Sequence, residues 1–190
     1  MFESELFGHE AGAFTGATHK KVGLMEVADD GILFLDEIAS MPMDLQAKLL
    51  RAIEERSFRR LGGNILINVD VQILAASNRN LKEMIANGSF REDLYYRLKV
   101  SDLDLPPLSA RKQDIPDLVG YFLRKFTLRS GSQITDVTPR AMKALMDYSW
   151  PGNIRELSNV MERAVIFCDD PVIDLNHLSS DVLSAVEPGT

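Results

Sequence analysis

The chain has 190 residues, of which 45% are hydrophobic and 26% are charged, and this balance excludes disordered and fibrous classes. Twenty-eight acidic and 21 basic residues give a net charge of -7, so we expect no direct binding to the phosphate backbone of DNA. The single cysteine, Cys168, forms no internal disulfide and fits a reducing compartment. Apolar runs are short and the first residues lack a secretory signal, so we expect a cytoplasmic protein without a membrane anchor.

A strand, a helix and a second strand are predicted in the first half of the chain. The apolar runs 32–35 and 69–76 predict buried strands. Between them, Leu45, Leu49, Ala52 and Ile53 have helical spacing within 44–58. This order favours a parallel sheet. Glycines 62 and 63 end the helical region, and the alternation of residues 65, 67 and 69 predicts a short hairpin arm.

The pattern changes near two consecutive prolines. Ser89 and Glu92 have the spacing of a capping box before a short helix through Leu98. Residues 99–105 alternate weakly, as an edge strand would, and prolines 106 and 107 end regular structure. We therefore expect one α/β domain over residues 1–107.

Helices alone are predicted after the prolines, over 115–128, 139–148 and 153–167. Thr138 before Pro139 is a strong start signal, and Asn153 with Glu156 is a weaker cap signal. We expect a small helical domain over 108–178 and a tail over 179–190, frayed from 187 onward.

Two adjacent acids, Asp36 and Glu37, follow the first predicted strand. Ligands of parallel sheets bind beyond the carboxyl ends of the strands. One carboxylate there can hold hydrated Mg²⁺ on the phosphates of a nucleotide, and the next can polarise an attacking water. An ordinary strand end with solvated acids is the alternative that the pair alone leaves open.

A hexapeptide elsewhere in the chain favours the nucleotide site over an ordinary strand end. Residues 12–17 read GAFTGA, the hallmark of the sigma-54-dependent transcriptional activators among the AAA+ ATPases. The segments ELFGHE (5–10), GILFLDE (31–37), FREDLYYRL (90–98) and WPGNIREL (150–157) also resemble this family in order. The resemblance covers residues 3–178.

The resemblance implies an α/β fold: an AAA+, P-loop NTPase-like parallel sheet core, incomplete at the N-terminus, followed by a small α-helical lid. The Walker B segment implies an ATP-binding stretch with Mg²⁺ on Asp36. That stretch comprises Ala28, Asp29, Asp30, Gly31, Ile32, Leu33, Phe34, Leu35, Asp36 and Glu37. Asp30 and Ile32 replace the usual Gly and Thr of the family, and Ser109-Ala110 replaces a common Arg-Glu.

The GAFTGA loop is implied to contact sigma-54 through Gly12, Ala13, Phe14, Thr15, Gly16 and Ala17. Phe14 and Thr15 are the positions that make the contact in the family. A loop rich in glycine and alanine buries itself poorly and could change shape with the state of a distant nucleotide. By composition alone, a disordered turn is the alternative.

Five further residues acquire roles only through the resemblance. Ser77 and Asn78 match sensor I, although such a pair after a strand is by itself typical of a turn or cap. Arg91 and Arg97 match arginine fingers that reach the nucleotide of a neighbouring subunit, where surface ion pairs are the alternative. Arg155 matches the lid arginine of sensor II, where a solvated helical face is the alternative.

No G-x-x-x-x-G-K-[ST] phosphate loop occurs in the 190 residues. We therefore expect a truncated form or fragment that hydrolyses ATP poorly alone, with a gap in its sheet that exposes apolar surface and unpaired backbone groups.

The implied function is an ATP-driven ring, a hexamer in the family, that remodels sigma-54 RNA polymerase holoenzyme for open-complex formation. DNA would be held by a separate domain. A non-hydrolysing sigma-54-binding module is the alternative, while another AAA+ machine, such as a loader or unfoldase, is disfavoured by GAFTGA.

Overall fold

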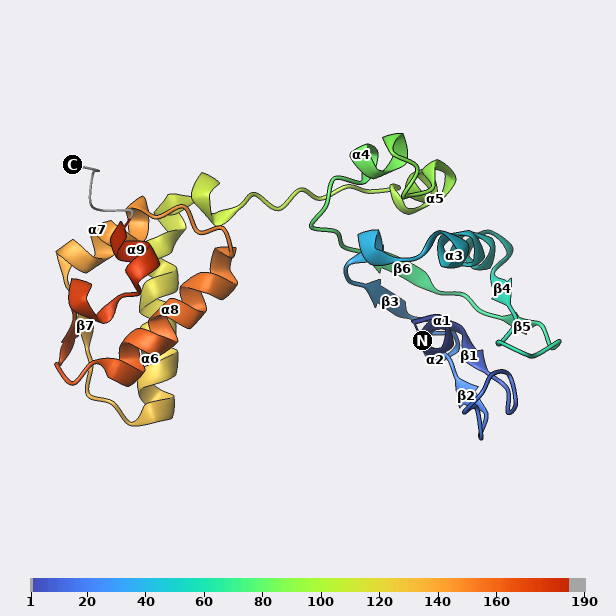
Figure 1. Ribbon diagram of the computed structural model, residues 1–190, viewed down its shortest axis with the longest axis horizontal. Coiled ribbons are helices and arrows are strands. Elements are labelled where there is room, and N and C mark those ends of the chain that lie inside the picture. The colour runs from blue at the N-terminus through green and yellow to red at the C-terminus, as the bar shows by residue number, and fades with distance from the viewer. Residues whose placement is uncertain (1, 185–190) are drawn as a thin grey trace. The chain divides into compact units, whose positions relative to one another are not determined.

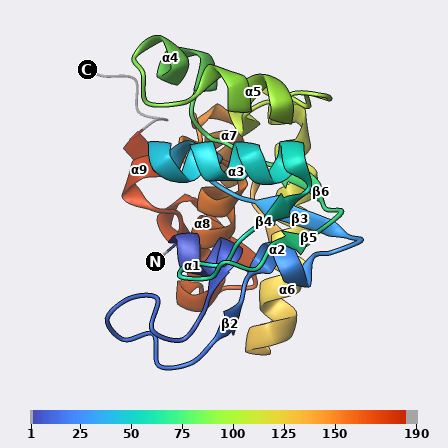
Figure 2. The same ribbon diagram turned by 90° about the vertical axis from the view of Figure 1, so that its right-hand side faces the viewer.

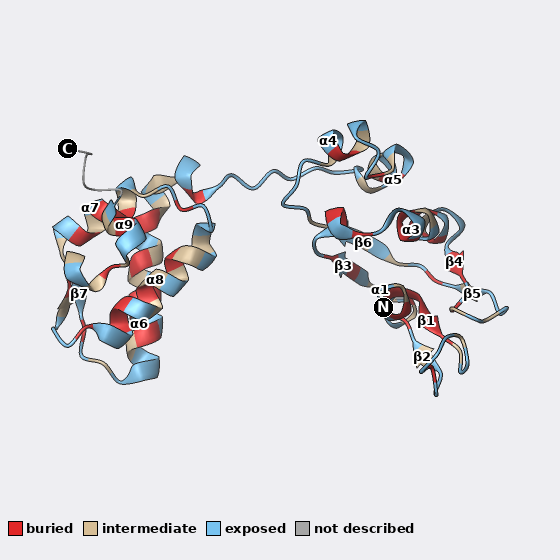
Figure 3. Ribbon diagram, viewed as in Figure 1, coloured by how far each residue is buried: buried red, intermediate tan, exposed pale blue. Residues whose placement is uncertain are grey.

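A computed structural model describes residues 2–184, and the chain divides into two compact units, Met1–Leu103 and Asp104–Thr190. Residues 99–107, which run from one unit into the other, are all exposed (Figures 1 and 3). Each unit has its own cluster of buried apolar side chains. Within the described part of the chain, no helix combines the length and apolarity that a bilayer crossing requires.

The first unit alternates short strands and helices. Its elements are α1 (Phe2–Phe7), β1 (Gly8–His9), β2 (Lys21–Val22), α2 (Leu24–Val27), β3 (Ile32–Leu35), η1 (Ile38–Ser40), α3 (Met43–Glu55), β4 (Ser57–Phe58), β5 (Ile67–Asn68), β6 (Gln72–Ala75), α4 (Leu81–Ala86) and α5 (Glu92–Leu98).

The predicted parallel pairing is confirmed, because β3 pairs with β6 in parallel and Leu33 lies opposite Ile73. The prediction that both strands are fully buried is wrong. Side chains alternate between the two faces of a strand, so Leu33 and Leu35 are buried, whereas Ile32, Phe34 and Leu74 are 65%, 54% and 56% exposed. One face of this pair is therefore apolar and open to solvent among the described residues.

The first unit also contains two antiparallel hairpins. The first pairs β1 with β2, and residues 10–20 form the loop that extends from it (Figures 1 and 2). The second pairs β4 with β5, which confirms the predicted arm, with Ile67 in its second strand. Leu61 joins the two hairpins: its amide donates to the Gly8 carbonyl at 3.1 Å, and its carbonyl accepts from the Glu10 amide at 3.0 Å.

Two local predictions in this unit are wrong. The Ser89 hydroxyl donates to the Asn87 side chain and to the Met84 carbonyl, and the N-cap of α5 is Arg91, whose side chain makes no cap bond. Residues 99–105 form no strand, and Val100 is 90% exposed. Weak alternation fails there because no described strand offers these residues a backbone partner.

The second unit is mainly helical. Its elements are η2 (Leu108–Ala110), η3 (Lys112–Asp114), α6 (Ile115–Ser130), β7 (Asp136–Val137), α7 (Pro139–Asp147), α8 (Asn153–Phe167), β8 (Val172–Ile173), η4 (Leu175–His177) and α9 (Ser180–Ser184). The three predicted helices are confirmed as α6, α7 and α8. The Thr138 cap is confirmed too, because its hydroxyl accepts from the Ala141 amide at 3.2 Å.

Three predictions for this unit need correction. The unit is not helical alone, because β7 and β8 form a short parallel pair. Asn153 does not cap α8: Gly152 is the N-cap, and the Asn153 side chain accepts from the Leu108 amide at 2.8 Å. The predicted tail forms α9 over Ser180–Ser184, because Val182 is fully buried against the core. The frayed end predicted for 187–190 lies outside the described residues.

Candidate functional site

The ends of β3 and β6 bring four predicted site residues together. In the parallel register Leu35 lies opposite Ala75, the Ala76 amide donates to the Leu35 carbonyl at 2.9 Å, and the Ile38 amide donates to the Ala76 carbonyl at 3.0 Å. These bonds lock the chain that carries Asp36 and Glu37 beside the chain that carries Ser77 and Asn78. All four side chains are exposed, so the strand ends form one polar, accessible edge.

The side chains at this edge are not equally available. The Ser77 hydroxyl both donates to the Arg79 carbonyl at 2.9 Å and accepts from the Arg79 amide at 3.0 Å, so Ser77 builds a turn. Asn78 forms no side-chain hydrogen bond within residues 2–184. One oxygen of Asp36 accepts from the Glu37 amide at 2.9 Å, and Glu37 itself adopts the left-handed conformation with a φ of 52°. The second oxygen of Asp36, the Glu37 carboxylate and the Asn78 amide remain available to a ligand.

Magnesium fits this edge only together with a ligand. Within the described residues, no group of three or more His, Cys, Asp or Glu side chains could hold a metal ion. Mg²⁺ usually takes one or two carboxylates and completes its shell with phosphate oxygens and waters. The exposed Asp36 carboxylate suits that role, and a nucleotide would supply the remaining oxygens.

The front of the predicted nucleotide-binding stretch lies elsewhere. Residues 28–31 form the turn that leads into β3, where the Gly31 amide donates to the Ala28 carbonyl at 2.9 Å and the Asp70 amide donates to the Asp29 carboxylate at 2.8 Å. The four-residue strand β3 lies between this turn and Asp36, so Gly31 and Asp36 are about 16 Å apart along the strand at ~3.3 Å per residue. The structure therefore does not bring residues 28–31 together with the acidic edge.

The two predicted arginine fingers stand at opposite ends of α5. Arg91 is the N-cap residue, and its guanidinium donates to both Asp93 oxygens at 3.0 and 2.6 Å. This contact raises the pKa of Arg91 and lowers the pKa of Asp93. Arg91, Glu92, Asp93 and Tyr96 line an open hollow of about 430 Å³. Arg97, in the last turn, is exposed and has no ion-pair partner among residues 2–184.

The GAFTGA segment forms a closed turn between β1 and β2. The Gly12 amide donates to the Ala17 carbonyl at 2.7 Å, and the Ala17 amide donates to the Phe14 carbonyl at 3.0 Å. Both glycines have positive φ angles, 81° and 99°, with open space where a Cβ would point. Phe14 is 38% exposed, and its ring contacts the His9 ring edge-on at 5.0 Å between centroids. Thr15 is exposed, so both predicted contact residues are accessible.

A buried arginine braces this turn, and sequence reasoning did not single it out. The Arg60 side chain is 7% exposed and pairs with Glu10 at 2.7 Å and with Glu26 at 2.6 Å. Both bonds raise the pKa of Arg60, with the Glu26 bond as the larger cause. Glu10 directly precedes the loop, Glu26 lies in α2 and Arg60 follows β4. Neither carboxylate nor guanidinium carries a sequence signal for this pairing, because the partners are 50 and 34 residues away.

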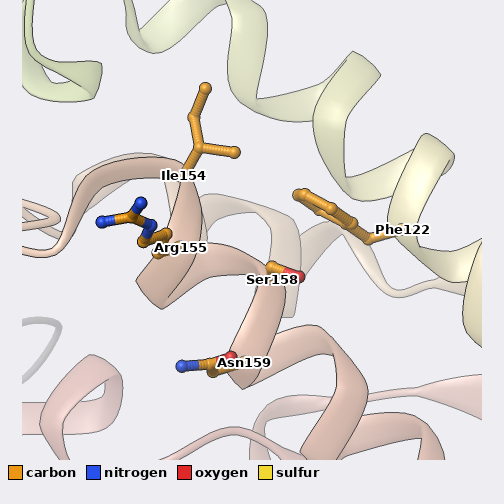
Figure 4. A pocket seen from close by; sticks show the side chains of 5 residues that line it. All are labelled: Phe122, Ile154, Arg155, Ser158 and Asn159. Atoms are coloured by element: carbon orange, nitrogen blue, oxygen red, sulfur yellow. The ribbon is translucent and has the colours of Figure 1, made fainter. Parts of the chain in front are cut away.

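Arg155 lies in the second unit, on the first turn of α8, and is exposed. Together with Phe122, Ile154, Ser158 and Asn159 it lines a shallow cavity of about 370 Å³ (Figure 4). No ion pair or hydrogen bond to its guanidinium is formed within the described residues. The Arg155 guanidinium is therefore available to a ligand, and it points away from Phe122 (Figure 4).

Comparison with known proteins shows the family and the fold of the chain. The Sigma-54 interaction domain family matches residues 1–104, which is more than half of the chain. The chain belongs to the sigma-54 interaction domain family. A second family, the AAA+ ATPase lid domain, matches residues 109–189, so the AAA+ fold inferred from the sequence is confirmed.

Relatives of this sigma-54 interaction domain include transcriptional regulators. The regulatory protein AtoC of Escherichia coli is 56% identical over 91% of this chain and 38% of its own length, and the nitrogen fixation protein AnfA of Azotobacter vinelandii is 48% identical over 100% of this chain and 36% of its own length. The crystal structure of NtrX from Brucella abortus in complex with ATP is 40% identical, with a TM-score of 0.89, over 99% of this chain and 41% of that chain. The chain thus spans about two fifths or less of the length of these relatives.

Proposed function

We propose that this chain is the sigma-54-contacting part of an AAA+ ATPase that couples ATP binding and hydrolysis to remodelling of sigma-54 RNA polymerase for open-complex formation. The observation that carries the proposal is that one compact unit holds both the acidic edge at the ends of β3 and β6 and the closed GAFTGA turn, braced by Arg60. A nucleotide-sensitive edge and a contact loop in one unit are what such coupling requires.

At the acidic edge, Asp36 would hold Mg²⁺ on the phosphates of ATP, which neutralises charge on the transferred group. Glu37 would orient and polarise the attacking water. Asn78, whose side chain has no partner within residues 2–184, would respond to the γ-phosphate. Ser77 is a weaker candidate, since its hydroxyl is already bonded to the Arg79 backbone.

The arginines extend the proposal to a ring of subunits. Arg97 forms no ion pair within the described residues, and Arg91 lines an open surface cavity. Either guanidinium could therefore reach the nucleotide of a neighbouring copy. A cation supplied in trans stabilises the charge that develops during phosphoryl transfer. Arg155 would reach the phosphates within its own subunit. We expect assembly into a hexamer, with promoter DNA bound by a separate domain.

Phe14 and Thr15 would make the contact to sigma-54. Both side chains are accessible at the turn, and two glycines with open surroundings allow the turn to change conformation. A module that binds sigma-54 without hydrolysing ATP is the second candidate, and it requires only the accessible Phe14 and Thr15 side chains.

Binding to sigma-54 tests the contact. Replacing Phe14 by Ala should weaken binding of the chain to purified sigma-54 by about tenfold or more, as expected for loss of an aromatic contact. Leu128→Ala, which truncates an 85% exposed side chain in the other unit, is the matched control and should bind as the wild type does. Equal binding by Phe14→Ala would contradict the proposed contact.

ATP turnover separates the two candidates. The chain is measured alone and mixed with a member of the same family that carries the phosphate loop and has its own fingers changed to alanine. Stimulated turnover in the mixture supports the ATPase part. Absence of turnover in both, with sigma-54 binding retained, supports the binding module.

A further inference from the structure

Gln46 is a polar side chain with no exposed surface, located on α3 inside the first unit. Its amide nitrogen donates to the Met41 carbonyl at 2.8 Å and to the Ser89 carbonyl at 3.3 Å. Its amide oxygen accepts from the Arg91 backbone amide at 2.8 Å. Both hydrogens of the amide group and its oxygen are thus used on backbone groups of other segments.

The three bonds connect two segments that are far apart in the sequence. Met41 follows η1, the short helix directly after Asp36 and Glu37. Ser89 and Arg91 flank the buried Phe90 and lead into α5. Within residues 2–184, no other hydrogen bond joins residues 36–42 to residues 88–92. The Gln46 amide is therefore the polar link between the acid-bearing segment and the start of the arginine helix.

The position of Arg91 depends on this link. Arg91 is the N-cap of α5, and its own side chain makes no cap bond to that helix. Asp93 accepts from the Leu94 amide of the first turn, whereas the backbone amide of Arg91 itself is held by the Gln46 oxygen from α3. The Arg91 guanidinium is bonded separately to Asp93. Gln46 therefore fixes the position of the Arg91 backbone, and Asp93 fixes the orientation of its guanidinium.

An apolar residue at position 46 would fill the same space without the free-energy cost of burying a polar group. Leu45, Leu49 and Ala52 of the same helix are buried by packing alone, whereas a buried amide is favourable only when its hydrogen bonds are all made. Three satisfied bonds to two separate segments fix their relative position more narrowly than packing does.

We propose that Gln46 is a positioning residue that ties Arg91 to the segment following Asp36 and Glu37. A shift of the acid-bearing segment in one subunit then moves the arginine that the subunit presents to its neighbour. The catalytic part of this proposal rests on the proposed function. The structural part, that Gln46 holds the Arg91 backbone, stands on the geometry alone.

Hydrogen exchange tests the structural part. Gln46→Met keeps the side-chain volume and removes the three bonds. We expect the Arg91 amide to exchange about tenfold faster, the factor for one net hydrogen bond, while the other amides of α3 exchange as in the wild type. Leu50→Ala, a packing change on the same helix, is the control and should leave the Arg91 amide unchanged. Unchanged exchange at Arg91 in Gln46→Met overturns the proposal.

A second variant guards against simple loss of packing. In Gln46→Glu, the protonated acid can still donate to Met41 and accept from Arg91, and burial raises the pKa of such a carboxyl. Both the protonated and the ionised carboxyl offer an oxygen to the Arg91 amide, and the ionised form is the stronger acceptor. At acidic pH, where the donor bond to Met41 is also kept, the Arg91 amide in Gln46→Glu should exchange as slowly as in the wild type. Exchange there as fast as in Gln46→Met overturns the proposal.

ATP turnover in trans tests the catalytic part. The chain is mixed with a phosphate-loop-containing family member whose arginine at the position of Arg91 is changed to alanine. Gln46→Met should lower the maximal stimulation severalfold at an unchanged half-saturating concentration, because assembly persists and the finger is misplaced. Leu50→Ala should keep the maximal stimulation. Equal maxima for Gln46→Met and wild type overturn the catalytic part. No stimulation by the wild-type chain itself overturns the proposed function, whereas hydrogen exchange still decides whether Gln46 holds Arg91.

Discussion

In the first unit, single side chains connect segments that are far apart in the sequence. Arg60 is the clearest case, since its buried guanidinium joins the base of the GAFTGA loop to α2 through Glu10 and Glu26. Burying a charge is costly unless it is paired, and removing one partner leaves the others uncompensated. The strength of this brace therefore depends on all three side chains together.

Replacing Arg60 by Met should lower the free energy of unfolding by on the order of 2 kcal/mol, because two partly buried carboxylates lose charge-assisted hydrogen bonds. Arg59→Met is the control: among residues 2–184 its exposed guanidinium bonds only to the Asn64 carbonyl, and we expect a change within about 0.5 kcal/mol. Urea unfolding followed by far-ultraviolet circular dichroism gives both values. Equal midpoints for the two variants would refute the bracing role.

Asp174 makes the second unit sensitive to acid. The Thr138 hydroxyl donates to its carboxylate at 2.5 Å, and this bond, followed by the Leu175 amide, lowers the pKa of Asp174. An unfolded Asp takes up its proton near pH 4, before the folded one does. Stability from this group is therefore present above about pH 4 and is lost as the pH falls through the lowered pKa.

We expect Asp174→Asn to weaken the decline in urea midpoint between about pH 5 and pH 2.5, whereas Asp169→Asn, a change at an exposed neighbour, should decline as the wild type does. The fluorescence of Trp150 reports unfolding of this unit, since it is the single tryptophan and is 1% exposed. An unaltered slope in Asp174→Asn would rule out the linkage.

At the scale of elements, the two hairpins lie against each other through a glycine. Gly62 has a φ of 68°, and a Cβ at this position would stand 2.8 Å from the Ala13 Cβ and 2.9 Å from its Cα. Leu61 makes backbone bonds to Gly8 and Glu10, on either side of His9 in the first strand of the first hairpin. The second hairpin thereby supports the GAFTGA turn at close range.

Gly62→Ala should separate the hairpins, because the added methyl group overlaps Ala13. Gly88→Ala is a matched control, with a similar φ of 74° and open space around the added atom. Both variants bear the cost of a left-handed alanine, about 1 kcal/mol, and Gly62→Ala should cost roughly 1 to 3 kcal/mol more through overpacking. Faster hydrogen exchange at the Glu10 and Leu61 amides in Gly62→Ala alone would locate the effect, and equal stability losses would argue against the contact.

At the scale of the whole molecule, each unit has a core of its own. The buried cluster of the second unit runs from Leu108 to Val182 and contains no residue of the first unit, while residues 99–107 are exposed. Separate cores are expected to unfold as separate cooperative units.

We expect a fragment of residues 104–190 to fold alone and to show the same Trp150 fluorescence transition in urea as the full chain. Circular dichroism of the full chain should not coincide with that transition, because it also reports the first unit. A transition in the fragment that is much less cooperative than in the chain, or no transition, would contradict independent folding.

Local patterns were enough for much of the secondary structure. Helical spacing and the Thr138-Pro139 start located the helices, and the order of strand, helix and strand gave the parallel pair, because these signals act within a few residues. The cap signals at Ser89 and Asn153 misled, since both side chains bond to groups outside the predicted motif: Ser89 to Asn87 and Met84, and Asn153 to Leu108. The strand predicted for residues 99–105 is absent because a strand requires a backbone partner, and the sequence of the strand itself does not specify one.

The sequence by itself determined the family, the GAFTGA segment and the acids at the end of β3, because contiguous residues carry these features. Only the tertiary structure decided that Ser77 is engaged in a turn, that Arg60 braces the loop and that Gln46 holds Arg91. These contacts join residues brought together by packing. Which groups form these hydrogen bonds depends on their distance and burial in the folded chain, and no local pattern of residues encodes either quantity.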